Sequence, residues 1–586
     1  MIRSVWPRVK RQGSMLLSHL RAESISRDGR DANECGRVGS VRFSVRTVPP
    51  PTRLISGLGP AEQQTEAETT LAGRDVMCPR IQQQFLKTCL FSRPLPLFYR
   101  FSLSASSSFS FFSSSSSSPP SSAPNSLPSA MSLSAYVDKL RRGQAPDFPA
   151  DADSAAFAKS LDQQDGLRHL RDEFLLPSKA SLRKRALDGT MPVQIDRAEH
   201  TTGREPNGNA SATSGDPADL ADACARPSAD IVGCSPNEIV IMNTLSVNLH
   251  LMMASFYRPA GRRNKVILEW KPFPSDHYII ESQVRWHGLD PAECMVKLEP
   301  DAGSALIPTE KVLAAIDRHA DDAALILLPG IQYYSGQLFD MATITARARS
   351  HGIVVGWDLA HAVGNVELRL HDWGVDFACW CTYKYLNAGP GSIAGSFVHE
   401  RHGFVHQPLD YHPRLAGWYG GDKAVRFNMD TLFVPSPGAS GFQLSNPSAI
   451  DLASLAGALS VFSKTSMRDL RSKALVLTAY LEHLLLHASS DGEPPFRILT
   501  PSDPAQRGTQ LSLLLHDGLL EPVSRALEDN GVVCDKRKPD VIRVAPVPLY
   551  CSFHDVWAFV QILRSAFRAD DARATRSRPC MQYAYV

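Results

Sequence analysis

Two apolar segments of this chain are each followed by a charged residue that could do chemistry. Ile353–Trp357 is followed at once by Asp358, and Phe377–Cys381 is followed closely by Lys384, which stands between two tyrosines. A lysine can hold an aldehyde cofactor as a Schiff base, and a carboxylate can keep the ring nitrogen of such a cofactor protonated. The pair predicts a site for pyridoxal phosphate (PLP), with Lys384 as the attachment point and Asp358 as the partner of the ring nitrogen.

Each of these residues also has an ordinary explanation. Most lysines are solvated surface groups, and Asp358 could cap a helix that begins at Leu359. A lysine at the end of an apolar strand is costly to bury unless it is used, so the two residues together favour the cofactor. A phosphate needs backbone N–H groups at a helix N-terminus, and the segment Asn243–Ser246 suits that task. A routine strand-to-helix turn is the competing explanation for this segment.

The elements around these residues predict an α/β fold. Between about 236 and 400, short apolar strands alternate with helices, which predicts a parallel or mixed sheet covered on both faces. Ligands of such sheets bind beyond the carboxyl ends of the strands, where Asp358 and Lys384 are expected. The expected strands are Ile239–Met242, Val266–Trp270, Leu325–Leu328, Ile353–Trp357, Phe377–Cys381 and Ile393–Val398, and the expected helices are Val247–Phe256 and Glu310–His319.

Composition and periodicity divide the chain into four parts. Residues 1–130 are rich in Arg, Ser and Pro and predict a disordered low-complexity extension, after which Met131 could open the functional protein. Residues 131–235 predict a helical arm and a polar insert, in which 203–223 is expected to be flexible. Residues 236–450 are the expected PLP-binding large domain. Residues 451–586 predict a smaller α+β domain, with nearby helices at Ala449–Phe462, Leu470–His487 and Phe553–Phe567 and strands at Phe496–Leu499, Leu511–Leu515 and Val541–Val544.

Charge and cysteine usage narrow the class of protein. Lys+Arg number 62 against 60 Asp+Glu in 586 residues, so no excess charge points to nucleic acid or an anionic membrane as a partner. Eleven cysteines without a C-x-x-C pair predict free thiols in a reducing compartment, without disulfides or a metal site, and Cys379 and Cys381 are expected to be buried. No apolar run is long enough to span a bilayer. We therefore expect a cytoplasmic protein.

The targeting role of the first residues is a separate question. Their many arginines suit a mitochondrial presequence, but the acidic segment Glu62–Glu68 and the length of the extension argue against it. A disordered tail or a translated upstream region is the preferred interpretation.

Longer motifs of the chain strongly resemble the kynureninase family. They are Asn243–His250, Phe273–Tyr278, Trp357–Asn365, His371–Cys381, Tyr383–Asn387, Ser445–Pro447 and Arg543–Tyr550. The resemblance runs from about 236 to about 568, and it separates the chain from the cysteine desulfurases, which share the fold class. It implies a fold-type I PLP enzyme, a homodimer, and hydrolysis of L-kynurenine or 3-hydroxykynurenine to an anthranilate plus alanine, in tryptophan catabolism and NAD biosynthesis.

The resemblance also implies roles for single residues. Lys384 is implied to be the Schiff-base lysine, Asp358 the partner of the pyridinium, and Tyr383 a phosphate contact and proton relay. Arg543 is implied to hold the α-carboxylate of the substrate, with Ser445 also on the substrate side. The remaining residues implied to bind the cofactor are Leu245, Ser246, Phe273, Asp276, His361, Trp418 and Asn446.

The chain departs from the family pattern in two places. Pro329 stands where some relatives have a serine that contributes to cofactor binding. Before the first strand, the chain lacks a Gly-Asn-Ser-Leu-Gly-Leu segment and a Gly-His segment ending in Pro-Trp, which bring a histidine and part of the substrate pocket. Residues 186–228 stand in their place, and His200 among them is given no role.

Three functions stay open at this point. The chain could be an active kynureninase, a relative that binds PLP but is catalytically impaired because the segment is missing, or another PLP-dependent lyase of the same fold. Arg543 and Trp418 lie within family motifs and argue against the third. The sequence does not decide between kynurenine and its 3-hydroxy form.

Overall fold

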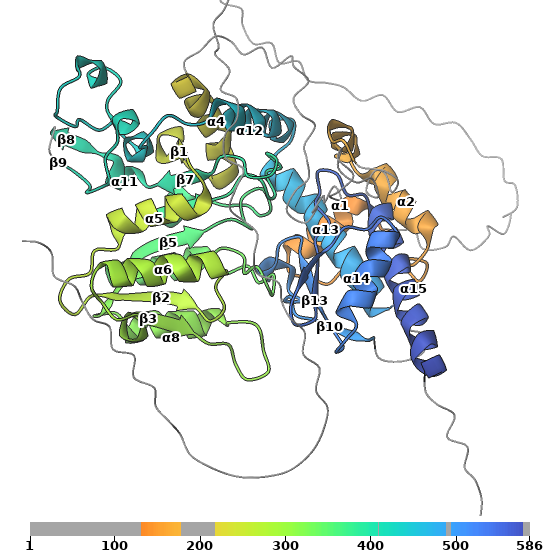
Figure 1. The fold of residues 1–586 in the computed structure, drawn as a ribbon. Helices are drawn as coiled ribbons and strands as arrows, with labels where there is room; N and C mark the ends of the chain where they lie inside the picture. The colour runs from red at the N-terminus through yellow and green to blue at the C-terminus, as the bar shows by residue number, and fades with distance from the viewer. Residues whose placement is uncertain (1–130, 177–216, 408–409, 488–493, 578–586) are drawn as a thin grey trace, which may run out of the picture. The chain divides into compact units, whose positions relative to one another are not determined.

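The computed structural model describes residues 131–176, 217–407, 410–487 and 494–577 (Figure 1). The predictions for residues 1–130 and for most of the polar insert lie outside these ranges. Within them, the chain is built around two sheets, one of seven strands and one of four.

The seven-stranded sheet has the order β1-β7-β6-β5-β4-β2-β3. Its neighbouring strands run parallel except for β7, which is antiparallel to both β1 and β6. This confirms the expected mixed, mostly parallel sheet. The strands are β1 (Ile239–Ile241), β2 (Lys265–Glu269), β3 (Met295–Leu298), β4 (Ala323–Pro329), β5 (Val354–Asp358), β6 (Phe377–Trp380) and β7 (Gly395–Val398).

Helices cover both faces of this sheet, and strand β4 shows why its sequence is continuously apolar. Leu325 and Leu327 pack in the same core as helices α5 (Leu245–Phe256) and α6 (Pro274–Trp286). Ile326 and Leu328 point to the opposite face, since successive side chains of a strand alternate. The helices that contribute to that second core include α4 (Pro217–Val232), α8 (Thr309–Arg318), α9 (Met341–Ser350) and α12 (Ala449–Phe462).

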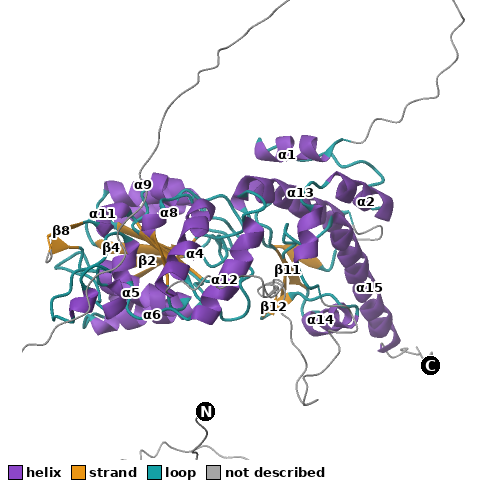
Figure 2. Cartoon of the chain, turned by 90° about the horizontal axis from the view of Figure 1, so that it is seen from above, coloured by secondary structure: helices purple, strands orange, loops and turns teal. Residues whose placement is uncertain are grey.

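The four-stranded sheet is antiparallel and has the order β10-β11-β13-β12. Its strands are β10 (Phe496–Ile498), β11 (Leu511–Leu515), β12 (Asp535–Arg537) and β13 (Val541–Val544), and it shares a core with α13 (Met467–Leu486), α14 (Leu520–Asp529) and α15 (Phe553–Ser577). The early helices α1 (Leu133–Arg141) and α2 (Ala155–Gln164) join the same core through Tyr136, Leu140 and Phe157. Both views show these two helices beside α13 and α15 (Figures 1 and 2).

The short elements complete the described part. They are α7 (Pro291–Cys294), α10 (Leu370–Trp373), α11 (Glu400–Gly403), β8 (Val405–Gln407) and β9 (Asp410–Tyr411), with several single 3-10 turns, among them η1 (Arg168–Glu173) and η3 (Trp418–Gly420). Cys379 and Cys381 are buried, as expected. No helix within the described ranges is long and apolar enough to cross a membrane.

The expected flexibility of residues 203–223 is wrong for their last part, because α4 begins at Pro217. The buried positions Ala221, Cys224, Ala225 and Val232 follow helical spacing and face the core of the large sheet. Small side chains carry little hydrophobic signal, and Pro227 lies inside this helix. The composition therefore predicted a loop, although the spacing of the buried positions is that of a helix.

Candidate active site

A cavity of about 510 Å³ lies where the central strands of the large sheet end. Asp358, the last residue of β5, and Pro329, the last residue of β4, are direct partners in the ladder and both line it. Lys384 enters from the loop after β6 and is buried. Open α/β sheets bind their ligands at this position.

The amine of Lys384 lies against an imidazole. Its Nζ is 3.1 Å from Nε2 of His361 and 5.7 Å from the centre of the Phe273 ring. Burial lowers the pKa of His361 well below its usual value, and the positive charge of Lys384 lowers it further. His361 is therefore neutral and accepts a hydrogen bond from Lys384. The other ring nitrogen, Nδ1, is buried and has no hydrogen-bond partner in the described part of the chain, which suggests a place for a ligand.

Two carboxyl groups meet in the same cavity. Asp276, in the first turn of α6, and Asp358 form a side-chain hydrogen bond, and the pKa of Asp276 is raised well above its usual range by burial first and by the charge of Asp358 second. Asp358 Oδ1 also accepts a hydrogen bond from the backbone N–H of Ala360 at 2.7 Å. That contact closes a turn, since residues 360–365 are not helical, so the helix-cap explanation for Asp358 does not hold.

Two helices begin at the wall of the cavity. Neither the Thr244 side chain before α5 nor the Phe273 side chain before α6 caps its helix. The hydroxyls of Ser246 and Ser275, in the two first turns, lie 2.7 Å apart. The first backbone N–H groups of a helix have no intrahelical acceptor and carry the positive end of the helix dipole. Together the two helix ends form a cradle suited to a phosphate.

Most of the residues predicted from the sequence therefore line one cavity. They are Leu245, Ser246, Phe273, Asp276, Asp358, His361, Tyr383 and Lys384. The cavity also includes Thr244, which lies in the segment predicted to hold a phosphate, and residues to which the sequence analysis gave no role, namely Ser275, Ile331, Tyr333, Ala360 and Gly391. Ser275 stands directly before Asp276 in a motif already recognised, and the helix that begins at Pro274 was the signal that was missed.

Arg543 does not line this cavity itself. It lies on β13, is buried, and its Nη1 donates a hydrogen bond to the backbone carbonyl of Tyr333 at 3.0 Å. Because the Tyr333 side chain lines the cavity, Arg543 is one residue removed from its wall. The predicted contact with a substrate carboxylate remains a prediction.

Three other predicted residues lie away from the cavity of their own chain. Trp418 is 47% exposed, and its Nε1 donates to the backbone carbonyl of Arg426. Ser445 and Asn446 are exposed and precede α12. Their roles stay predictions, and a single chain does not bring them to the cofactor site.

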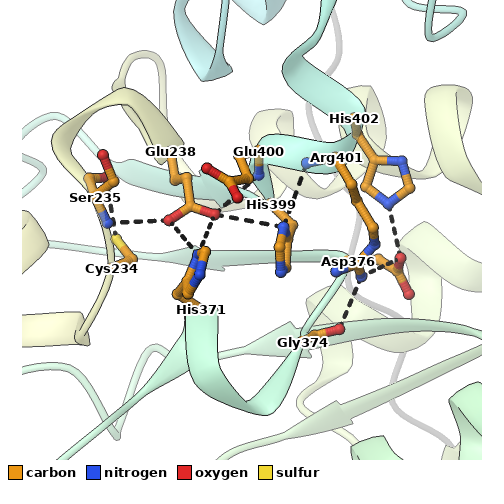
Figure 3. Close-up of polar contacts among 10 residues, drawn as sticks. All are labelled: Cys234, Ser235, Glu238, His371, Gly374, Asp376, His399, Glu400, Arg401 and His402. Atoms are coloured by element: carbon orange, nitrogen blue, oxygen red, sulfur yellow. Dashed lines mark hydrogen bonds and ion pairs between the residues drawn. The ribbon is translucent and has the colours of Figure 1, made fainter.

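A second group of titratable side chains surrounds the buried Glu238 (Figure 3). The carboxylate accepts hydrogen bonds from the backbone N–H groups of Ser235 and Glu400 and from Nδ1 of His371 at 3.0 Å. The hydrogen bond with Glu238 raises the pKa of His371. The His399 ring stacks on that of His371, and burial lowers the pKa of His399 to about 4.

This group has spacing that could suit a metal ion, because ligand atoms of Glu238, His371 and His399 lie within 4.8 Å of one another. Nδ1 of both imidazoles, however, already faces the same oxygen of Glu238, at 3.0 Å for His371 and 3.5 Å for His399. Both oxygens of Glu238 already accept N–H groups. The arrangement fits a buried ion pair that holds the chain before β1 to the starts of α10 and α11.

Comparison with known proteins places these observations in a family. Residues 470–563 match the model of the kynureninase C-terminal domain. The chain is 59% identical to kynureninase 1 of Neurospora crassa, over 74% of this chain and 98% of that protein. It is 50% identical to kynureninase 2 of Phaeosphaeria nodorum, over 76% of this chain and 98% of that protein. The resemblance predicted from the motifs is confirmed.

The alignment with the Neurospora protein also contains a gap. It is 478 positions long, whereas 74% of the 586-residue chain is about 434 residues. About 44 aligned positions therefore have no residue of this chain.

Solved structures of similar fold are PLP enzymes at low sequence identity. The structure of a C-DES mutant with glycine covalently linked to its PLP cofactor has a TM-score of 0.50 at 16% identity, over 61% of this chain and 89% of that one. The cysteine desulfurase CsdA from Escherichia coli has a TM-score of 0.50 at 16% identity, over 69% and 99%. These likenesses confirm the fold that was expected.

Proposed function

Because the chain belongs to the kynureninase family, whose members are PLP-dependent hydrolases, we propose that it cleaves the Cβ–Cγ bond of L-kynurenine, 3-hydroxy-L-kynurenine or both. The products are an anthranilate and L-alanine, so the reaction belongs to tryptophan catabolism and serves NAD biosynthesis. The observation that carries the proposal is the single cavity that brings together Lys384, Asp358 and two uncapped helix N-termini.

The residues of the cavity fit PLP. The N–H groups at the starts of α5 and α6, with the hydroxyls of Ser246 and Ser275, would hold its phosphate. Asp358 would pair with the ring nitrogen, and the Phe273 ring would lie against the pyridine ring. The unsatisfied Nδ1 of His361 would find its partner in the bound group. When bound, PLP supplies an aldehyde that condenses with amines and a ring that withdraws electrons.

The chain's own groups then have distinct tasks. Lys384 anchors the cofactor, gives way to the substrate amine, and takes and returns the proton at the substrate Cα. Neutral His361, 3.1 Å from Lys384 Nζ, accepts a hydrogen bond from this amine and so orients it. Tyr383 lines the cavity and would relay protons near Cβ, and Arg543 would bind the α-carboxylate through its planar guanidinium.

We propose a homodimer in which exposed apolar residues of one chain cover the site of the other. Large apolar side chains are unusually exposed between Leu415 and Leu432, and the group comprises Leu415, Trp418, Phe427, Met429 and Leu432. Large apolar side chains that gather exposed in one segment are typical of an interface. A second copy would explain why Trp418 and Asn446 do not line their own cavity. Sedimentation of the wild type and of Phe427→Glu tests this proposal. We expect the wild type to sediment as a dimer and the variant as a monomer.

The cellular setting follows from the same family. We propose that the enzyme works in the cytoplasm on small molecules, without nucleic acid or membrane as a partner. Fractionation of cells that express the chain would check the compartment.

The alternative named from the sequence, a PLP protein that is catalytically impaired, is separated from the enzyme by one assay. An assay of the PLP-loaded chain for anthranilate and alanine decides between the two candidates, with Lys384→Ala as the inactive reference. Turnover above that reference supports the enzyme, and PLP binding without it supports the second candidate.

A further inference from the structure

Arg543 is held by a buried carboxylate. Asp535 on β12 and Arg543 on β13 are direct cross-strand partners, and Oδ2 of Asp535 forms an ion pair with Nη2 of Arg543. The side chains are 5% and 2% exposed. The second oxygen of Asp535, Oδ1, accepts a hydrogen bond from Nη1 of Arg537 at 2.7 Å. One carboxylate therefore bridges two guanidinium groups, of which only that of Arg543 is fully buried.

The same part of the small sheet is tied to the wall of the cofactor cavity. Ser512, the partner of Arg543 on β11, donates a hydrogen bond from its hydroxyl to the carbonyl of Tyr334 at 2.6 Å. Gln510 Nε2 and Arg543 Nη1 both donate to the carbonyl of Tyr333, at 3.1 and 3.0 Å. The guanidinium of Arg543 is thus oriented from two directions, by the Asp535 carboxylate and by the Tyr333 carbonyl.

The charges of this group add to one positive unit. Arg537 and Arg543 contribute two positive charges and Asp535 one negative charge. The one positive charge that remains matches the negative charge of a single substrate carboxylate. This charge reaches the cavity, because both arginines help to lower the pKa of His361. A buried guanidinium without a counter-ion is costly, and it would turn towards other acceptors or water. Asp535 offsets this cost while the site is empty.

We propose that Asp535 is a positioning residue for recognition of the substrate's α-carboxylate, which keeps Arg543 buried and aimed, while Arg537 restores the positive charge that Asp535 removes. The proposal rests on the proposed function, since it takes Arg543 as the group that binds that carboxylate. The paired hydrogen bonds between a guanidinium and a carboxylate depend on geometry as well as on charge. Loss of the Asp535 contact therefore weakens substrate binding even though Arg543 keeps its charge.

The test uses the PLP-loaded enzyme and a pair of ligands that differ only at the carboxyl group. L-alanine and L-alaninamide are titrated while the cofactor absorbance is followed, and the ratio of the two dissociation constants reports carboxylate recognition. We expect Asp535→Ala to reduce the preference for L-alanine by about tenfold or more, the range for a charged hydrogen bond. PLP affinity should stay unchanged, and Asp535→Glu should keep most of the preference. Added formate should restore it in Asp535→Ala, whereas formate should compete with L-alanine in the wild type.

The controls separate positioning from folding and from the role of Arg543. Glu521→Gln removes a carboxylate that pairs with Lys536 on the exposed side of β12 and should leave the preference within about twofold. Asp535→Asn keeps the side-chain volume and serves if Asp535→Ala unfolds, which melting temperature reveals. The preference for L-alanine could be lost in Arg543→Lys but kept or increased in Asp535→Ala and Asp535→Asn. That result overturns the positioning role of Asp535 and leaves the role of Arg543 standing. A wild-type enzyme without the preference overturns both this proposal and the role of Arg543.

Discussion

The carboxyl groups of Asp276 and Asp358 are hydrogen-bonded to each other beside the lysine that is proposed to hold the cofactor. Such a bond needs a proton, and Asp276 carries it, because burial and the charge of Asp358 raise the pKa of Asp276 well above its usual range. The two residues therefore have different tasks. On the proposed function, Asp358 would offer a charge to the ring nitrogen of PLP, and Asp276 would donate a hydrogen bond that orients Asp358.

The first prediction separates these two carboxyl groups. Asp276→Asn should keep PLP affinity within severalfold, because the amide still donates to Asp358. Asp358→Asn should weaken PLP binding by tenfold or more, since it removes the charge opposite the ring nitrogen. Titration of the apoenzymes with PLP, followed by fluorescence, measures both. Equal losses in the two variants would show that Asp276 acts as a charged group.

The pair of Glu238 and His371 should make stability depend on pH in one direction. The folded-state pKa of His371 is raised by Glu238, so its contribution is fully present below the unfolded pKa of about 6.5 and is lost as pH rises through the folded value. His371→Gln should therefore lower the melting temperature more at pH 6 than at pH 9. The imidazole is partly exposed, so the effect should be small. A loss of melting temperature in His371→Gln that grows as the pH rises would contradict this assignment.

Arg543→Lys should weaken substrate binding more than PLP binding. The charge remains, but the planar fork that matches a carboxylate is lost. We expect KM for L-kynurenine to rise by about tenfold or more, the range for a charged hydrogen bond, with little change in PLP affinity. Arg497→Lys is the matched control, because that arginine lies on β10 of the same sheet, with β11 between it and β13, and is exposed. Equal losses of substrate and cofactor binding would mean that Arg543 supports the fold instead.

Much of the site could be predicted because its residues lie in local sequence patterns that are recognisable on their own. Apolar strands that end in Asp358, or closely precede Lys384, are visible in the sequence, and the sheet then brings their ends together. Ser275 was missed because the start of α6 has no capping side chain to announce it. The pairing of Asp535 with Arg543 depends on the register between β12 and β13, which eight residues of sequence separation do not reveal. The start of α4 was missed because its buried side chains there, Ala221, Cys224 and Ala225, are small.

The departure from the family before α4 leads to a prediction about turnover. As it stands, the chain should bind PLP but turn over kynurenine slowly, because loss of one positioned acid/base group costs on the order of 10²–10⁴ in rate. A version that carries a typical kynureninase segment between residues 187 and 216 should be faster by such a factor. Steady-state assays of both proteins at equal PLP occupancy measure this. Full activity of the unmodified chain would show that its own residues rebuild the substrate pocket.

The most direct measurement is the identification of the lysine that holds the cofactor. The PLP-loaded protein is reduced with borohydride and digested, and the labelled peptide is found by mass spectrometry. The account predicts a label on Lys384 alone, and neither label nor visible absorbance in Lys384→Ala. Lys271 is the main competitor, because burial lowers the pKa of its amine, and this amine lies over the ring of Tyr334, which follows the cavity residue Tyr333 in the chain. A label on Lys271, or no label on Lys384, would contradict the account.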